Sequence, residues 1–438
     1  MKRPSVLAFL AGWVFLAILT TSCAARAEPG DELEAWVLTM GPGDGPFEKF
    51  GHNAIWIHDR LVDEDYVYNF GTYAFSSSDL LGKFWAGRLK YWLSRRKSIE
   101  ATVRSYQRDN RTVVAQKLDL DAEQKDRLFE ALEVNLEPEN RYYKYDYYLD
   151  NCSTRVRDAV DGVAGGALRQ VAQQPARHTF RGHTLRSTAD LLAEYLVLDA
   201  AMGSFIDRPI DSWAEMFLPA ELQAGLGRAR LRGADGIERP LVVEEEVLFQ
   251  ATRPDKAVDP PRWMPSVLVA GAAIGGALAG LGALARTGRG GARVALGSLV
   301  ALCGAILGFL GCFYVFGWAA TDHRVTWANE NILQMTPWTI ALAILGVGVA
   351  LGRPRATRRA WFLAAAAAAA AALGALLKVL PWFAQDNWRI VAFCLPLWCG
   401  AAVGLWLAGR AASQAPAAGA PAQGATAPAA QDTDAVAA

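Results

Sequence analysis

Long apolar runs dominate the C-terminal third of the chain, and they constrain the fold more than any other feature of the sequence. Five such runs lie at about 265–285, 294–319, 338–352, 361–383 and 389–409. A helix needs roughly 20 apolar residues to cross a bilayer, and most of these runs reach that length. The sequence therefore predicts an all-α membrane domain of about five transmembrane helices over residues 263–410.

The loops between these runs predict an orientation. The first loop, RTGRGGAR, and the third, GRPRATRRA, are rich in arginine and contain no acidic residue. Loops of this kind face the cytoplasm. Residue 262 and the polar loop at 321–337 are then expected on the outer side of the membrane.

The N-terminus gives independent support for export of the segment that follows it. Residues 1–27 have a basic start, an apolar stretch and Ala-Arg-Ala before Glu28, which is typical of a cleaved secretory signal peptide. A lipoprotein-type cut at Cys23 and an uncleaved anchor helix are the alternatives. All three interpretations export residues 28–262. At the other end, residues 411–438 consist mainly of Ala, Pro, Gln and Thr, and a disordered tail is expected.

Residues 28–262 are charged and aromatic, like a soluble domain, and their pattern favours an α+β fold. The whole chain has 44 basic and 44 acidic residues, so its zero net charge does not suggest a nucleic-acid partner. Periodicity predicts a strand at 35–40, a hairpin from 49–59 and 61–73, a helical segment at 76–93, a strand ending at 120, a helix at 121–136, a second helix from 151, and short helices near 187–200 and 219–229.

Cys152 is the only cysteine of this polar segment. In an exported domain it has no disulfide partner nearby, so it is either a buried structural residue or a nucleophile. Asn151 is a candidate N-cap, which would put the thiol in the first turn of a helix. There the unpaired N–H groups and the helix dipole favour the reactive thiolate, and the same N–H groups can stabilise an oxyanion.

A catalytic thiol also needs a base and a group that orients the base. Of the four histidines in the segment, His52 is favoured because it begins a predicted strand directly after Gly51. His58, His178 and His183 are the others. Asn69, on the neighbouring strand of the hairpin, is a candidate for the third group. No CxxC or HxxxH spacing occurs, so a metal site is not expected.

Several blocks in this order carry a family resemblance. They are GPGDGPFEKFGHNAIWIHD, DYVYNFGTYAF, FWAGRLKYWL, PENRYYKYDYYLDNCSTRVRD and GSFIDRPIDSWAEMFLPAEL. Together, over residues 33 to about 250, they resemble the periplasmic domain of the bacterial lipoprotein N-acyltransferases called Lnb. The resemblance implies a circularly permuted papain-like (NlpC-type) thiol fold, in which the histidine strand precedes the cysteine helix.

The resemblance also implies the site and the reaction. Cys152 would be the nucleophile, His52 the base, and Asn69 the orienting residue, with Asn53 and Tyr68 as competitors for the last role. Cys152 would take an acyl chain from a membrane phospholipid as a thioester and pass it to the N-terminal amine of a diacylglyceryl-cysteine lipoprotein, without metal or cofactor. The protein would be a multi-pass protein of the bacterial inner membrane with its catalytic domain in the periplasm.

Four further residues are candidates for substrate binding: Asn151, Tyr148, Arg181 and His323. The tyrosines at 142–148 either line a pocket or pack in the core. Arg181 and Arg186 either bind phosphate or lie solvated on the surface. The loop that contains His323 either closes over the site or merely connects two helices. Two other functions compete with acyl transfer: a cell-wall amidase or peptidase of the same fold, and a non-enzymatic membrane scaffold.

Overall fold

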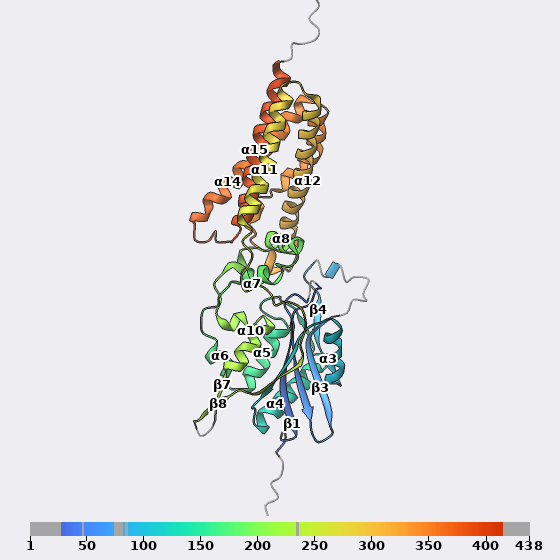
Figure 1. Ribbon diagram of the computed structural model, residues 1–438, viewed down its shortest axis with the longest axis vertical. Coiled ribbons are helices and arrows are strands. Elements are labelled where there is room, and N and C mark those ends of the chain that lie inside the picture. The colour runs from blue at the N-terminus through green and yellow to red at the C-terminus, as the bar shows by residue number, and fades with distance from the viewer. Residues whose placement is uncertain (1–27, 46–47, 74–81, 84–85, 234–235, 415–438) are drawn as a thin grey trace, which may run out of the picture. The chain divides into compact units, whose positions relative to one another are not determined.

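The computed structural model describes residues 28–45, 48–73, 82–83, 86–233 and 236–414 (Figure 1). The predicted signal peptide and residues 415–438 of the predicted tail lie outside this description. The chain forms two compact units. Unit 1 contains the residues up to Arg262 together with Phe316–Asn329 and Trp382–Asp386, and unit 2 contains Trp263–Val315, Glu330–Pro381 and the residues from Asn387 onward.

Unit 1 is built on a seven-stranded sheet with the order β6-β4-β3-β2-β1-β5-β9. Every neighbouring pair is antiparallel. The strands are β1 Leu33–Met40, β2 His52–Asp59, β3 Glu64–Thr72, β4 Lys90–Arg96, β5 Val113–Leu118, β6 Tyr142–Lys144 and β9 Val242–Phe249. The predicted strand at 35–40 and the predicted hairpin are confirmed as β1, β2 and β3.

Helices cover both faces of this sheet. On one face, α4 (Ala122–Leu136) and α5 (Cys152–Val163) bury Leu128 and Val156 against alternate residues of β2, such as Ile55. On the other face, α3 (Ile99–Arg108) packs on a second cluster that includes Ala54 and Trp56 (Figure 1). The alternation read from the sequence of β2 thus divides its side chains between two cores.

Two local predictions need correction. The segment 76–93 was expected to be helical, yet its described end, from Lys90, belongs to strand β4, where Tyr91 and Leu93 are buried and Trp92 between them is less so. Aromatic residues at this spacing suit a half-buried strand. Residues 99–108, which were read as the approach to a strand, form helix α3, started by a Ser98 side chain that accepts the Ala101 N–H.

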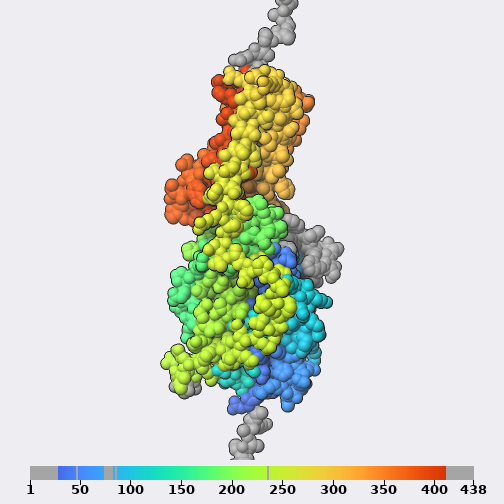
Figure 2. All heavy atoms as spheres, in the orientation of Figure 1, coloured from blue at the N-terminus to red at the C-terminus, as the bar shows by residue number. Residues whose placement is uncertain are grey.

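Short helices complete unit 1. They are α6 Ala167–Val171, α7 Phe180–Ser187, α8 Leu192–Ala201, η1 Ser204–Asp207, α9 Ser212–Glu215 and α10 Pro219–Arg228, followed by a small hairpin of β7 Arg230–Arg232 and β8 Glu238–Pro240. Figure 2 shows the segment after β9 running over the surface of this unit. Ion pairs hold that segment in place, including Arg253 with Asp44 at 3.1 Å and Lys256 with Asp190 at 2.9 Å.

Unit 2 is helical, as predicted. Among the residues that the structure describes, four helices are long and apolar enough to cross a membrane: Met264–Arg286 (α11), Gly290–Ala320 (α12), Pro354–Val379 (α14, Pro354–Leu376, with the turn η5, Leu377–Val379) and Trp388–Arg410, the apolar part of α15 (Trp388–Gln414). Glycines allow close backbone approach between them, for example at Gly275, where an added β-carbon would overlap the carbonyl of Pro396.

The prediction of about five transmembrane helices is therefore corrected to four long helices and one short segment. That segment is Pro337–Ala350, made of η4 (Pro337–Ala341) and α13 (Leu342–Ala350). It runs antiparallel to α12, since Gly311 faces Pro337 and Arg293 donates to the Ala350 carbonyl. From Gly311 to Arg293, α12 rises about 27 Å, close to the thickness of a bilayer's hydrocarbon core.

Candidate active site

The site begins with the capped N-terminus of α5. The Asn151 side chain accepts the Thr154 N–H at 2.9 Å, and the Thr154 hydroxyl accepts the Asn151 N–H at 2.8 Å. This reciprocal cap fixes the first turn of the helix and makes Cys152 its first residue. The predicted N-cap and the predicted position of the thiol are thus confirmed.

The Cys152 thiol is buried and lies beside His52. Burial by itself would raise the pKa of the thiol, but the His52 imidazole, through its charge and a hydrogen bond, and the backbone N–H groups of Asn53 and Ser153 lower it. The net direction is a lowered pKa. A lowered pKa increases the thiolate fraction, which is the nucleophilic form of cysteine.

His52 in turn contacts Asn69, because β2 and β3 pair side by side. The His52 Nε2 atom lies 3.3 Å from the Asn69 Oδ1 atom. The Asn69 amide group donates to the Val67 carbonyl at 3.2 Å, which orients its oxygen toward the imidazole. An amide oxygen only accepts, so Nε2 carries the proton and Nδ1 is left as the proton acceptor of the ring.

The two competitors for the place of Asn69 are engaged elsewhere. The Asn53 side chain is buried and donates to Leu38 O and Thr39 Oγ1. The Tyr68 hydroxyl donates to Glu133 Oε1 at 2.5 Å. The structure therefore brings Cys152, His52 and Asn69 together and leaves the side chains of Asn53 and Tyr68 out of the contact.

The other histidines have different partners. His58 pairs with Asp65 at 3.0 Å, His178 contacts the Val258 carbonyl at 3.0 Å, and His183 pairs with Glu215 at 2.9 Å. Among the part of the chain that the structure describes, no group of three or more His, Cys, Asp or Glu side chains is arranged to hold a metal ion.

A cavity of about 320 Å³ is lined by residues of the tyrosine segment, Tyr145 among them. Cys152 does not itself line the cavity, but the Tyr145 ring and the Cys152 Cβ both lie near the same point beside Gly71. Gly71 has a φ of +86°, and a β-carbon there would lie 3.5 Å from the Tyr145 ring and 3.7 Å from the Cys152 Cβ. Glycine is suited to this position because of its positive φ, and Tyr145 therefore lies between the cavity and the neighbourhood of Cys152.

Two of the predicted substrate-binding residues are used inside the protein. The Asn151 side chain is the helix cap, and it also donates to the carbonyls of Tyr147 and Phe217. Tyr148 lines the cavity with part of its surface, but its hydroxyl is buried against Thr184 at 2.8 Å. Both interpretations of the tyrosines at 142–148 therefore apply. Tyr148 packs in the core, while Tyr145 and Tyr147 line a cavity.

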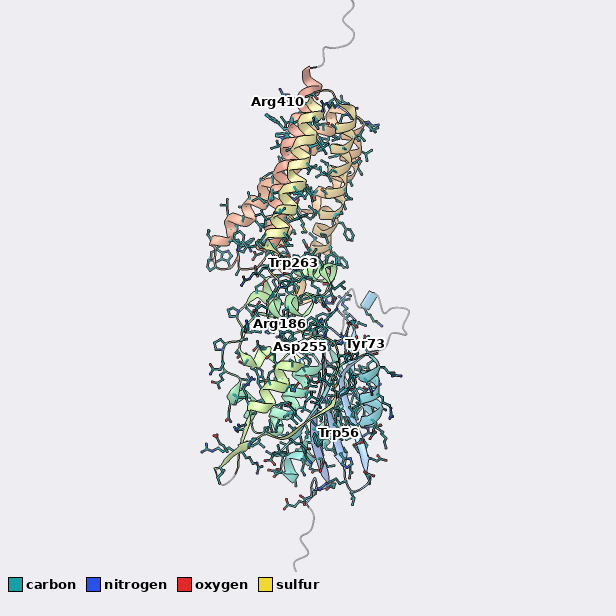
Figure 3. All side chains as sticks on the ribbon, in the orientation of Figure 1. Trp56, Tyr73, Arg186, Asp255, Trp263 and Arg410 are labelled. Carbon is teal, nitrogen blue, oxygen red and sulfur yellow. The ribbon has the colours of Figure 1, made fainter. Side chains whose placement is uncertain are left out.

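Arg181 is not available to bind phosphate. Its side chain is 1% exposed and is enclosed by the carboxylates of Asp199 and Asp207 and by the carbonyls of Asp199, Met202 and Gly203. Arg186, labelled in Figure 3, donates to His183 Nδ1 and to Glu221. Neither residue is a solvated surface arginine, and the prediction of a phosphate site at these positions is wrong.

His323 lines the cavity. It lies in the segment Phe316–Asn329, which belongs to unit 1. Its ring stacks on Tyr147 with centroids 6.3 Å apart. The neighbouring Asp322 accepts hydrogen bonds from Lys144 at 3.2 Å and from Arg88 at 3.4 Å. The loop is therefore more than a connector, because it forms one wall of the cavity.

Sequence reasoning missed the groups that act through the backbone. The N–H groups of Asn53 and Ser153, which stabilise the thiolate, carry no signal in the residue types themselves. Gly71 and Tyr145 were part of quoted motifs, yet their position beside the sulfur depends on the pairing of β3 with β4 and of β4 with β6. The NFG and KYDYY motifs were the available signals.

Residues 23–188 match the family model of the Lnb N-terminal periplasmic domain. No curated protein and no solved structure matches the chain. This part of the chain is therefore similar to an Lnb N-terminal periplasmic domain, and among the described residues four helices are long and apolar enough to cross a membrane. The permuted papain-like relationship stays a prediction.

Proposed function

We propose that this protein belongs to the Lnb family and is a cysteine-dependent lipoprotein N-acyltransferase. In this proposal Cys152 takes an acyl chain from a membrane phospholipid and delivers it to the N-terminal amine of a diacylglyceryl-cysteine lipoprotein. The observation that carries the proposal is the contact of the Cys152 thiol, in the first turn of α5, with His52, which itself contacts Asn69. The match of residues 23–188 to the Lnb periplasmic domain supports the same reaction class.

The first half-reaction forms the thioester. His52 accepts the thiol proton, and the thiolate attacks the carbonyl carbon of a phospholipid ester. The N–H groups at the start of α5 offer hydrogen bonds to the oxyanion of the tetrahedral intermediate. When the ester C–O bond breaks, the imidazolium returns its proton to the leaving alkoxide, so that a lysophospholipid departs and the acyl chain remains on Cys152.

The second half-reaction forms the amide. The acceptor amine attacks the thioester carbonyl and transfers a proton to His52 as the C–N bond forms. The C–S bond then breaks, and the thiolate that leaves is the form that its surroundings favour. Asn69 keeps the imidazole in one tautomer throughout both steps, since its amide oxygen accepts only from Nε2–H.

The membrane helices suit substrates of this kind. Donor and acceptor both carry acyl chains, and a catalytic domain on the same chain as apolar helices stays at the bilayer that holds them. A cell-wall amidase would instead act on water-soluble peptides and would have no use for the helices. A scaffold would have no need of a thiol with a lowered pKa.

The test is complementation in a strain that lacks lipoprotein N-acylation, read by mass spectrometry of lipoprotein N-termini. Wild type is expected to add one acyl chain, and Cys152→Ala and His52→Ala are expected to add none. His58→Ala is the matched control, because His58 contacts Asp65 rather than the thiol. Absence of the extra chain with wild-type protein, together with cleavage of soluble muropeptides, would overturn the proposal in favour of the amidase.

A further inference from the structure

The cavity lined by Tyr145 combines an aromatic wall with charged groups, so its surface suits a partly polar ligand better than a purely apolar chain. Tyr91, Tyr145, Tyr147 and Phe205 supply the aromatic surface. Lys144 and Arg324 supply positive charge, and Asp146, Asp150 and Asp322 supply negative charge. Which of these charges is already neutralised decides what the cavity can bind.

The wall formed by the segment 322–325 is firmly built into unit 1. The Asp322 N–H donates to the Ala86 carbonyl at 2.9 Å, and the Gly203 N–H donates to the Val325 carbonyl at 2.7 Å. Glycines permit both approaches: a β-carbon at Gly87 would lie 2.9 Å from the His323 nitrogen, and one at Gly203 would overlap the Trp327 carbonyl. Arg324 is therefore held at a fixed place on the cavity.

The three carboxylates of the cavity are engaged by neighbouring groups. Asp146 accepts the N–H groups of Tyr148 and Leu149, each at 3.0 Å. Asp150 forms a two-bond pair with Arg155 at 2.6 and 2.9 Å. Asp322 is paired with Lys144 and Arg88.

Two guanidinium groups near the cavity form no ion pair with a carboxylate of the described residues. Arg324 and Arg208 both lie over the ring of Phe205, with their central carbons 5.5 and 4.5 Å from its centroid. Neither forms an ion pair with any residue that the structure describes. Arg181 and Arg186, by contrast, are saturated by acidic partners. Arg324 thus offers exposed forked donors in the cavity itself, and Arg208 lies over the ring of Phe205, which lines the cavity.

We infer that Arg324 and Arg208 bind the phosphodiester of the glycerophospholipid that donates the acyl chain. Guanidinium groups form paired hydrogen bonds to phosphate oxygens, and stacking on Phe205 holds them in place. The glycerol backbone would then lie along the cavity, with its ester near Tyr145 and the thiol. This inference rests on the proposed function and adds the feature of the donor that is recognised, namely its phosphate.

The experiment uses the full chain in detergent and follows acylation of Cys152 by mass spectrometry before any amine is supplied. Phosphatidylglycerol is compared with a diacylglycerol that carries the same chains and no phosphate. Wild type is expected to react at least about tenfold faster with the phospholipid, and the Arg208→Gln/Arg324→Gln double variant is expected to lose most of this preference. Arg324→Lys is expected to be intermediate. Arg127→Gln, an exposed arginine of α4, is the matched control and should match wild type.

Three outcomes overturn the inference. One is equal reaction of both donors with wild type, and another is an unchanged preference in the double variant. The third is inhibition by inorganic phosphate at concentrations as low as those of the phospholipid, which would assign the arginines to free phosphate. If no donor acylates Cys152, the proposed function fails. The inference is then decided by native mass spectrometry of Cys152→Ala protein, where preferential retention of phosphatidylglycerol supports it and equal retention of both lipids overturns it.

Discussion

The surroundings of Cys152 and of Arg181 are two buried polar regions of unit 1 that stabilise a charge in different ways. Arg181 is enclosed by two carboxylates and three backbone carbonyls, which occupy its donors. The Cys152 thiolate is stabilised by one imidazole and two backbone N–H groups, which together outweigh the effect of its burial. The contacts of Arg181 hold a structural group in place, whereas the contacts of Cys152 favour the nucleophilic form of a reactive group.

Removing the thiol should produce the largest functional effect with the smallest structural one. Cys152→Ala is expected to reduce acyl transfer by at least about a thousandfold, because the neighbouring Ser153 and Thr154 hydroxyls donate to the carbonyls of Met216 and Asn151 and cannot replace the thiol. Its melting temperature should stay close to that of wild type, since Asn151 caps the helix independently. Activity and thermal unfolding are measured on the same detergent-solubilised protein. Residual activity within tenfold of wild type would assign the chemistry to another residue.

Removing Arg181 should produce the opposite result. Arg181→Met leaves the carboxylates of Asp199 and Asp207 buried without a cation, and a loss of about 3–5 kcal/mol in the free energy of unfolding is expected. Arg177→Met is the control, because its partner Asp259 and Arg177 itself are both exposed, and it should cost no more than about 1 kcal/mol. Thermal denaturation measures both. Equal melting temperatures for the two variants would contradict the stabilising role of the buried cluster.

The sequence could distinguish these regions only in part. The alternation of side chains with a period of two and the Asn151 cap can be recognised from the local sequence. They are enough to predict β2, α5 and the position of the thiol. Arg181 was interpreted as a phosphate ligand because its partners, Asp199 and Asp207, come from segments with no shared pattern. The strand at 90–96 was missed because its pairing with β3 and β6 is non-local. Groups of the backbone, such as the Ser153 N–H, are invisible in residue types altogether.

The pH dependence of the thiol tests what holds its charge. Burial raises the pKa of Cys152, and His52 with the two N–H groups outweighs it, so the thiolate should persist to lower pH than in a free cysteine. In His52→Ala the effect of burial prevails, and the midpoint of iodoacetamide alkylation is expected to move to higher pH. The alkylation rate is followed by mass spectrometry between pH 5 and 10, with His183→Ala as control. A midpoint that does not move would show that His52 leaves the thiol's charge unaffected.

The segment 322–325 forms one wall of the cavity. At Gly203 its contacts are made by backbone atoms. Gly203→Ala places a methyl group against the Trp327 carbonyl, at an estimated cost of about 1–3 kcal/mol. The segment should loosen, and trypsin should cleave after Arg324 faster than in wild type. Gly162→Ala in α5 is the control, because nothing lies within 4 Å of its added carbon. Identical cleavage rates in both variants would contradict the docking of the segment.

The smallest effect is expected at Asn69, and its size tests whether orientation alone is at stake. Asn69 does not touch the thiol; it accepts one hydrogen bond from His52 at 3.3 Å, a neutral contact worth about 0.5–1.5 kcal/mol. Asn69→Ala should therefore lower kcat by about three- to tenfold and leave KM for the donor unchanged, whereas Asn140→Ala, in the exposed turn after α4, should change neither. A drop as deep as that of Cys152→Ala would mean that Asn69 contacts the reacting atoms. An unchanged kcat would mean that the packing of β2 against β3 already fixes the imidazole. Asn69 would then be a structural residue rather than a part of the reactive site.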